Sequence, residues 1–379
     1  MATKIDNPFL VSGYESPEFF CDRVQETEDL LTALQNGQNV TLTSPRRMGK
    51  TGLILHAFQR LNQLYPQRKT IYIDLFPTEN LTDFARTFSL GVLGQLDSNP
   101  MRILKKATAL LKGLRLNMTV DEITGQPKLG VDVTQGNETT TIEQVFDYLK
   151  RNEKECYIAL DEFQQIATYP EKNVEALLRS HIQNLHHVHF IFSGSRVHML
   201  NEMFLSPKRP FYQSSTNKTI GPIDKTSYFS FAEHFFAWQG RKLPEETFRF
   251  LYDRYQGHTW YVQKVLNKLY EKQNLLLNDE AVTEAIADIL KDNEYYYQIL
   301  LRAYSRGQGK LLKAIANERI AKGITSGAFI TKYGLTATSS VKSALLRLVD
   351  DEIIYPSEDG YMIYDRFFGD WLSQTYRFQ

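Results

Sequence analysis

The chain has 379 residues, with 44 lysines and arginines against 44 aspartates and glutamates, so its formal net charge is zero. A neutral chain does not attract nucleic acid by bulk charge, and any such site must be a local basic patch. No apolar run approaches the roughly 18 residues of a membrane span, and residues 1–20 lack the apolar core of a signal peptide. Two distant cysteines are typical of a reducing cytosol. We therefore expect a cytoplasmic protein of two or three domains with no membrane partner.

The first 222 residues alternate between strand and helix patterns. Short β-rich or buried apolar runs predict strands at residues 39–44, 70–76, 156–166 and 188–195. Helical spacing predicts helices at residues 51–65, 81–112, 141–152 and 173–187, and residues 115–137 read as a hairpin around "TGQP". Strands that alternate with helices predict an α/β fold with a parallel sheet covered on both faces.

The pattern changes after "TIGPID" (219–224), because residues 225–290 carry only helical periodicity. Residues 291–379 contain three short helical segments and then a two-stranded ribbon at residues 352–365, which is the order of elements in a winged helix-turn-helix. We expect three domains: an α/β core at residues 1–222, a helical lid at 223–290 and a winged helix-turn-helix at 291–379. The tyrosine cluster at residues 295–297 is expected to lie on a helix packed between lid and winged helix.

The stretch "TSPRRMGKTG" is close to the phosphate-loop pattern G-x-x-x-x-G-K-[ST]. A strand precedes it and a helix follows it, which is the context that a phosphate loop requires. Ser44 stands in the place of the first glycine, and we expect it to be tolerated if its backbone angles are ordinary. The residues predicted to contact the nucleotide are Ser44, Pro45, Arg46, Arg47, Met48, Gly49, Lys50, Thr51 and Gly52.

Two of these residues have assigned chemistry. Lys50 is expected to reach the β- and γ-phosphates of ATP, and the Thr51 hydroxyl to ligate Mg²⁺. The strand "YIALDEF" ends in Asp161 and Glu162. Asp161 is the second predicted ligand of Mg²⁺, and Glu162 is the predicted general base that polarises the attacking water.

The strand "FIFSGSR" ends in polar residues that are candidates to sense the γ-phosphate. They are Ser193, Ser195 and Arg196, of which Ser195 and Arg196 are taken as catalytic candidates. Asp74, at the end of another strand, also faces the carboxyl edge where α/β sheets bind ligands. We interpret Asp74 as structural.

These motifs, in this order, resemble those of the prokaryotic AAA+-like ATPases of the archaeal-type family, close to the STAND signalling ATPases. The resemblance covers nearly the whole chain, through "NPFLVSGY", "FFCDRVQE", "LTSPRRMGKT", "IALDEFQ", "FSGSRVHML", "RPFYQS", "IGPI", "YQGHTWYVQ" and "GYMIYDRFFGDWL". It implies a P-loop NTPase sheet with a helical lid and a C-terminal winged helix, and ATPase activity. It also implies that Arg23 lies near the adenine and that Gly257, in the lid, lies near the nucleotide.

The chain departs from the family pattern at several places. Ser44 replaces glycine, Thr259 stands where the lid usually has proline, and Arg366 replaces a proline near the end. The segment "FYQSS" lacks the arginine that relatives often carry after the tyrosine. Hydrolysis is therefore expected to be slow, or to need a partner or a second subunit. An oligomer is thus one of the possible states of the protein.

The C-terminal unit has an uneven charge. Residues 301–350 contain nine basic and two acidic residues, whereas residues 351–379 contain two basic and six acidic ones. A basic helix-turn-helix body favours phosphates, with Thr338, Ser339, Ser340 and Lys342 at the start of its third helix. The acidic wing at Glu358 and Asp359 would be repelled by DNA, so a protein partner is favoured over DNA.

Three functions follow from these patterns. The first is an ATP-dependent switch, with ATP and ADP as ligands, that repositions a winged-helix interaction module. The second is a DNA-binding ATPase that loads or regulates another factor. The third is a nucleotide-dependent scaffold with little turnover.

Overall fold

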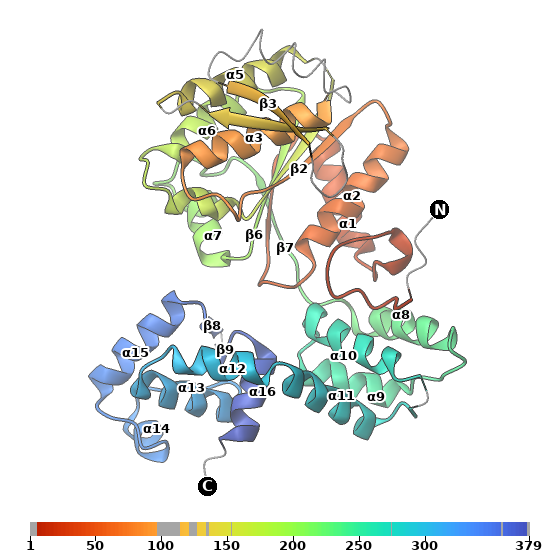
Figure 1. Cartoon of the computed structure of the whole chain (residues 1–379), viewed down its shortest axis with the longest axis vertical. Helices are drawn as coiled ribbons and strands as arrows, with labels where there is room; N and C mark the ends of the chain where they lie inside the picture. Colours follow the sequence, from red (N-terminus) through yellow and green to blue (C-terminus); the bar gives the residue numbers. More distant parts are fainter. Residues whose placement is uncertain are drawn as a thin grey trace. The chain divides into compact units, whose positions relative to one another are not determined.

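The computed structural model describes residues 6–96, 114–120, 127–133, 136–152, 154–273, 275–357 and 359–376, and only the backbone for 114–120 and 127–132. The chain divides into two compact units (Figure 1). The first is Ser12–Asp224, and the second joins Lys225–Gln379 to the N-terminal residues up to Val11. None of the helices in the described parts is both long and apolar enough to cross a membrane.

A five-stranded parallel sheet forms the centre of the Ser12–Asp224 unit. Its strands are β1 (Val40–Thr43), β2 (Lys69–Asp74), β5 (Cys156–Asp161), β6 (Val188–Gly194) and β7 (Thr216–Thr219). They lie in the order β2-β5-β6-β1-β7, and every neighbouring pair is parallel. The four expected strands are present, but the third ends at Asp161 instead of residue 166, because Phe163–Thr168 form a 3₁₀ helix. Strand β7 was not anticipated. Its sequence, TNKT, has no apolar residue because an edge strand with half-exposed side chains needs none.

Helices cover both faces of this sheet, as the sequence pattern predicted. They are α1 (Val24–Gln35), α2 (Lys50–Leu64), α3 (Leu81–Leu96), α5 (Glu138–Arg151), α6 (Val174–Ile182) and α7 (Val197–Leu205). Alternate residues of β5 belong to different cores: Tyr157 and Ala159 pack with α1 and α2, whereas Ile158 and Leu160 pack with α3, α5 and α6. This alternation is what two covered faces require.

The expected hairpin is present as β3 (Leu114–Val120) and β4 (Pro127–Val133), which pair antiparallel in a separate sheet. Residues 124–126 of its expected turn lie outside the described residues. So does the part of the expected helix 81–112 that follows Leu96.

The second unit is mainly helical. The lid pattern folds as α8 (Lys225–Ala237), α9 (Glu245–Arg254), α10 (Thr259–Glu271) and α11 (Asp279–Asp292). The winged helix contains α12 (Glu294–Arg302), α13 (Arg306–Glu318), α14 (Gly327–Lys332), α15 (Thr338–Asp350), β8 (Ile354–Ser357), β9 (Gly360–Ile363) and α16 (Arg366–Thr375). The expected boundary at residues 290 and 291 lies inside this unit, and the three-domain division stays a prediction.

The N-terminal segment joins the second unit through one aromatic side chain. Phe9 is completely buried, and its ring lies 5.2–6.1 Å from those of Phe231, Phe235, Phe236 and Tyr270. Edge-to-face and tilted arrangements of this kind add to the free energy of apolar burial.

Candidate nucleotide-binding site

The loop between β1 and α2 contains one strict glycine position. Gly49, immediately before α2, has φ +94°, a conformation that L side chains rarely adopt. Ser44 is completely buried and is not among the residues with positive φ. Ser44 thus meets the backbone condition set for it, and its role in nucleotide binding stays a prediction.

The side chain of Lys50 is buried inside this loop. Its ammonium donates to the carbonyl oxygen of Ser44 at 3.2 Å, to Ser44 Oγ at 3.3 Å and to the carbonyl oxygen of Pro45 at 3.5 Å. Burial lowers the pKa of Lys50, and the negative charges of Glu162 and Asp161 oppose that shift. The loop thus holds a cation whose present partners are mostly neutral carbonyl groups.

Thr51 and Asp161 lie 110 residues apart in sequence and touch in the structure. The Thr51 hydroxyl donates to Oδ2 of Asp161 at 2.8 Å. The hydroxyl of Tyr72 donates to the same oxygen at 2.6 Å, and the Ser193 hydroxyl donates to Oδ1. A hydroxyl and a carboxylate in contact form the type of oxygen donor set that Mg²⁺ prefers, so these residues fit the expected metal.

Glu162 follows β5 in a left-handed conformation, with φ +53°. Its Oε2 accepts hydrogen bonds from Ser195 Oγ at 2.8 Å, from Ser195 N at 3.3 Å and from Gln164 Nε2 at 2.5 Å. Arg46 Nε donates to the Ser195 hydroxyl at 3.3 Å. The candidate sensor Ser195 therefore connects the expected base to the phosphate loop.

Two residues at this site were missed from the sequence, Tyr72 and Gln164. The alternation of side chains along β2 could have predicted the position of Tyr72. It places Ile71 and Ile73 on one face of the sheet and Tyr72 on the other face, against which α2 packs. For Gln164 the signal is weaker, since the residue lies in a 3₁₀ helix, Phe163–Thr168. A Cβ added to Gly194 would lie 1.9 Å from Gln164 Oε1, so this glycine makes room for the amide.

Arg23 contacts the phosphate loop from outside it. The residue is buried, with φ +63°, and its guanidinium donates to the carbonyl oxygen of Met48 at 3.2 Å and to Glu26 at 2.7 Å. This geometry fixes the backbone just before Gly49. Its placement near the adenine stays a prediction.

The remaining candidates lie as follows. Met48 is buried, Gly52 is half-buried beside the ring of Phe20, and Pro45 and Arg47 are exposed. Arg196 immediately precedes α7 and donates to the sulfur of Met199 at 3.8 Å.

Asp74 accepts the backbone N–H of Phe76 at 2.9 Å, which agrees with a structural role, and burial raises its pKa.

Gly257 belongs to the second unit and closes α9. Its N–H donates to the carbonyl oxygen of Tyr252 at 2.8 Å, and the N–H of Gln256 donates to that of Asp253 at 3.1 Å. Gln256 and Gly257 both have positive φ, and this pair of bonds is a Schellman motif that ends a helix. Proximity of Gly257 to the nucleotide stays a prediction.

The sequence model of an ATPase domain found predominantly in Archaea matches residues 20–265, which is more than half of the chain. The chain belongs to this family. A second model, described as a probable winged helix domain, matches residues 295–374. The protein therefore combines an archaeal-type ATPase domain with a C-terminal winged helix. The relation to STAND ATPases stays a prediction.

Solved structures share this fold along nearly the whole chain. A Walker-type ATPase of Pyrococcus abyssi has a TM-score of 0.64 at 17% identity, over 96% of this chain and 99% of that one. The ORC2 protein of Aeropyrum pernix, in complexes with ADPNP and ADP, has a TM-score of 0.59 at 16% identity, over 97% of each chain. The ORC1 protein of Aeropyrum pernix, in complex with DNA, has a TM-score of 0.54 at 16% identity, over 97% and 96%. Among curated proteins, no relative matches this chain significantly.

Proposed function

We propose that the protein binds ATP with Mg²⁺ at the phosphate loop and hydrolyses it, and that its winged helix responds to the nucleotide and binds a protein partner. The observation that supports this most is the 2.8 Å contact between Thr51 and Asp161, next to the buried ammonium of Lys50. The ORC2 protein of Aeropyrum pernix, which shares the fold, forms complexes with ADPNP and ADP. That favours a nucleotide over other phosphate ligands.

Each group at the site has its own role in the proposed phosphoryl transfer. When bound, Mg²⁺ neutralises charge that develops on the phosphate oxygens, and Thr51 and Asp161 are the residues that would hold it. Lys50 would exchange its carbonyl partners for β- and γ-phosphate oxygens, whose full charges attract an ammonium more strongly than neutral dipoles do. The backbone N–H groups at the start of α2 face the same anion.

Glu162 is the proposed general base. Its three hydrogen bonds all go to Oε2, and they hold the carboxylate in one orientation. Within the described residues no hydrogen bond to Oε1 is present, so that oxygen is available to accept a proton from water. A positioned base of this kind contributes about 10²–10⁴-fold to a rate.

Two variants test the site. Lys50→Ala should lose tight binding of a fluorescent ATP analogue, because it removes the charge opposite the phosphates. Glu162→Gln should keep the binding and nearly abolish phosphate release, since it preserves size and the metal ligands. Wild-type affinity in Lys50→Ala would overturn the site. Tight binding without any phosphate release in the wild type would favour the scaffold.

The exposed face of α12 favours a protein partner. The expected packing of this helix holds for Tyr297, which is 3% exposed, but is wrong for Tyr295 and Tyr296, which are 78% and 58% exposed. Ile299, one turn on, is 48% exposed. Aromatic side chains are enriched in protein interfaces, so this face is the proposed contact.

The switch is tested by hydrogen exchange with and without a non-hydrolysable ATP analogue. Altered protection in residues 294–375 is expected when the analogue binds. Identical protection in both conditions would leave a static ATPase with an appended domain.

DNA binding is the second candidate, supported by the exposed start of α15. Thr338, Ser339, Ser340 and Lys342 are all exposed there, and Lys342 makes no ion pair with any described residue. The ORC1 protein of Aeropyrum pernix, which shares the fold, is in complex with DNA.

Fluorescence anisotropy with duplex DNA over a salt series tests this candidate. Lys342→Glu should weaken binding and reduce its salt dependence, whereas Lys291→Glu, an exposed lysine of α11, should not. Equal binding in both variants would remove α15 as a DNA contact.

A further inference from the structure

Two motifs that lie more than a hundred residues apart in the chain meet in the second unit. They are "YQGHTWY" at residues 255–261 and "DRFFGDW" at residues 365–371. The first joins α9 to α10 in the lid pattern, and the second forms the start of α16 at the end of the winged helix. We call their meeting place the lid–α16 contact, and it includes Arg254, which precedes the first motif.

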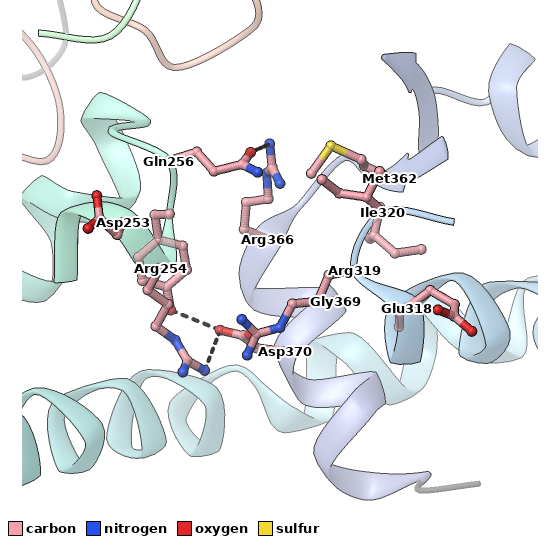
Figure 2. A pocket seen from close by; sticks show the side chains of 13 residues that line it. Asp253, Arg254, Gln256, Glu318, Arg319, Ile320, Met362, Arg366, Gly369 and Asp370 are labelled. Carbon is pink, nitrogen blue, oxygen red and sulfur yellow. Dashed lines mark hydrogen bonds and ion pairs between the residues drawn. The ribbon is translucent and has the colours of Figure 1, made fainter. Parts of the chain in front are cut away.

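The polar part of the lid–α16 contact is an ion pair with flanking hydrogen bonds (Figure 2). Arg254 pairs with Oδ2 of Asp370 at 3.1 Å, and the Tyr255 hydroxyl donates to the same oxygen at 2.9 Å. Gln256 Oε1 accepts from the guanidinium of Arg366 at 3.2 Å. The side chains of Arg254 and Asp370 are only 19% and 14% exposed. Removal of one charge would leave the other largely buried without its partner, which is strongly unfavourable.

Phe367 is the apolar centre of the lid–α16 contact. Its side chain is buried, and its ring lies 5.0–5.9 Å from the rings of Tyr255, Trp260 and Tyr261. Edge-to-face and tilted aromatic pairs add to the free energy of apolar burial. The contact between the lid pattern and the winged helix therefore has a desolvated core as well as polar bonds.

The backbone of Arg366 adds a bond that a proline at this position could not make. Its N–H donates to the hydroxyl of Tyr261 at 3.1 Å, whereas proline, which the family pattern has here, carries no N–H. The same hydroxyl donates to the carbonyl oxygen of Tyr364 at 3.4 Å. The departure from the family pattern at Arg366 thus strengthens the lid–α16 contact.

The chain passes between the two units at two places, Val11–Ser12 and Asp224–Lys225. At the first place the chain is anchored on both sides. The carbonyl oxygen of Val11 accepts from Trp260 Nε1 of the second unit at 2.9 Å. The Tyr14 hydroxyl donates to a glutamine of α2, in the first unit, at 2.5 Å. The passage between these anchors is therefore short.

The second place is anchored in a similar way. Ile220 is buried in the core that contains β1 and α2, and Lys225, the first residue of α8, forms a 2.6 Å ion pair with Asp253 of α9. A passage of chain cannot extend beyond about 3.3–3.6 Å per residue. Two short passages therefore allow the units to rotate about the line that joins them, but not to move apart.

We propose that the lid–α16 contact holds the helical lid and the winged helix together as one body, which turns relative to the Ser12–Asp224 unit when nucleotide binds. The turning rests on the proposed function, whereas the single body rests on the contacts of Phe367 and Asp370. The winged helix is then repositioned with its contact to the lid unchanged. The two short passages act as the hinge.

Distances between pairs of spin labels in the full chain test the proposal. The labels are attached at Gln63→Cys in α2, Glu284→Cys in α11 and Ser343→Cys in α15, which are exposed positions, and the two native cysteines are buried. Mg²⁺ and a non-hydrolysable ATP analogue should shift the distances from position 63 to positions 284 and 343. The distance between positions 284 and 343 should stay the same. A shift of that distance on nucleotide binding would overturn the proposal.

A variant of the contact supplies a measurement that needs no nucleotide. Asp370→Asn removes the charge opposite Arg254 with little change in size, and it should broaden the distribution of distances between positions 284 and 343. Gln374→Ala, at an exposed position of α16, should leave that distribution narrow. Circular dichroism establishes that both variants are folded. An equally wide distribution in wild type and Asp370→Asn would show that this contact does not hold the body together.

The two measurements distinguish failure of the inference from failure of the proposed function. If the analogue binds and no distance shifts, while Asp370→Asn still broadens the distribution, the nucleotide switch is refuted and the single body stands. If the distances from position 63 shift and the distance between positions 284 and 343 shifts too, the switch stands and the single body is refuted.

Discussion

The hydroxyl of Tyr72 and Oδ2 of Asp161 form a 2.6 Å hydrogen bond across two neighbouring parallel strands. The same carboxylate oxygen accepts from Thr51. Burial, followed by the charge of Asp161, raises the pKa of Tyr72 well above its usual value, so the phenol stays protonated and donates. Tyr72 therefore orients a predicted metal ligand without being one.

Tyr72→Phe should weaken Mg²⁺ affinity in the ATP complex by about 10–100-fold, the usual effect of losing a partner of a metal ligand. ATP affinity measured without Mg²⁺ should not change. Tyr157→Phe is the control, because it removes another tyrosine hydroxyl of the sheet, bonded to Arg68 at 2.8 Å. Equal Mg²⁺ dependence in Tyr72→Phe and wild type would refute this orienting role.

Ser195→Ala should slow phosphate release by about tenfold, equivalent to roughly 1.4 kcal/mol, with ATP affinity unchanged. The reason is that Ser195 Oγ is one of three donors that orient Glu162, and Gln164 and a backbone N–H remain. Single-turnover phosphate release measures the effect. Ser214→Ala, which removes a half-buried hydroxyl bonded to a backbone carbonyl, should behave as wild type.

Gly194→Ala should have the same effect on turnover as removing the Gln164 side chain. The new Cβ would lie 1.9 Å from Gln164 Oε1, so the amide must move and release Glu162. We expect reduced turnover, and no further reduction when Gln164→Ala is added, since both changes break the same contact. Gly94→Ala, where nothing lies within 4 Å of the added Cβ, should be neutral or stabilise by about 0.5–1 kcal/mol. Additive effects of the two changes would contradict the shared contact.

Binding of ATP should be accompanied by proton uptake at alkaline pH. Burial lowers the pKa of Lys50 below its ordinary 10.5 in the nucleotide-free protein, and phosphate groups raise it again. Between the lowered pKa and 10.5, the unfolded chain binds more protons than the folded one, so this contribution to stability rises with pH.

ATP affinity should fall as the pH rises over the same range, because the phosphates bind the protonated form of Lys50. Calorimetry in two buffers of different ionisation enthalpy measures the uptake. In Lys50→Arg, whose guanidinium stays charged, the uptake should vanish. Uptake of the same size in Lys50→Arg would assign it to another group.

Arg319 caps the C-terminal end of α13 with φ +60° and ψ −52°. Arg319→Gly should raise the free energy of unfolding by about 1 kcal/mol, since glycine adopts positive φ without strain. Chemical denaturation of the variant and wild type provides the comparison. Lys322→Gly is the matched control: it replaces an exposed basic residue nearby that is not among those with positive φ, and it should not stabilise. Destabilisation in Arg319→Gly would show that the turn carries no strain.

Several features could be predicted from the sequence because each depends on residues close together in the chain. The strand, loop and helix around Lys50, the acids after β5 and the hairpin pattern are local signals of periodicity and turn chemistry. The structure and the family assignment agree with these predictions. The sequence also correctly located Ser193 and Ser195 at the carboxyl edge of the sheet.

Other features depended on the tertiary structure. Edge strand β7 has no apolar pattern, and it forms only because β1 offers backbone groups for pairing. Tyr72 meets Asp161 across 89 residues of sequence, and Phe9 packs on helices more than 220 residues later. Periodicity reports which face of an element is buried, but not which element covers it. Strand order and helix packing make that choice, and they determined which residues became the partners of Glu162.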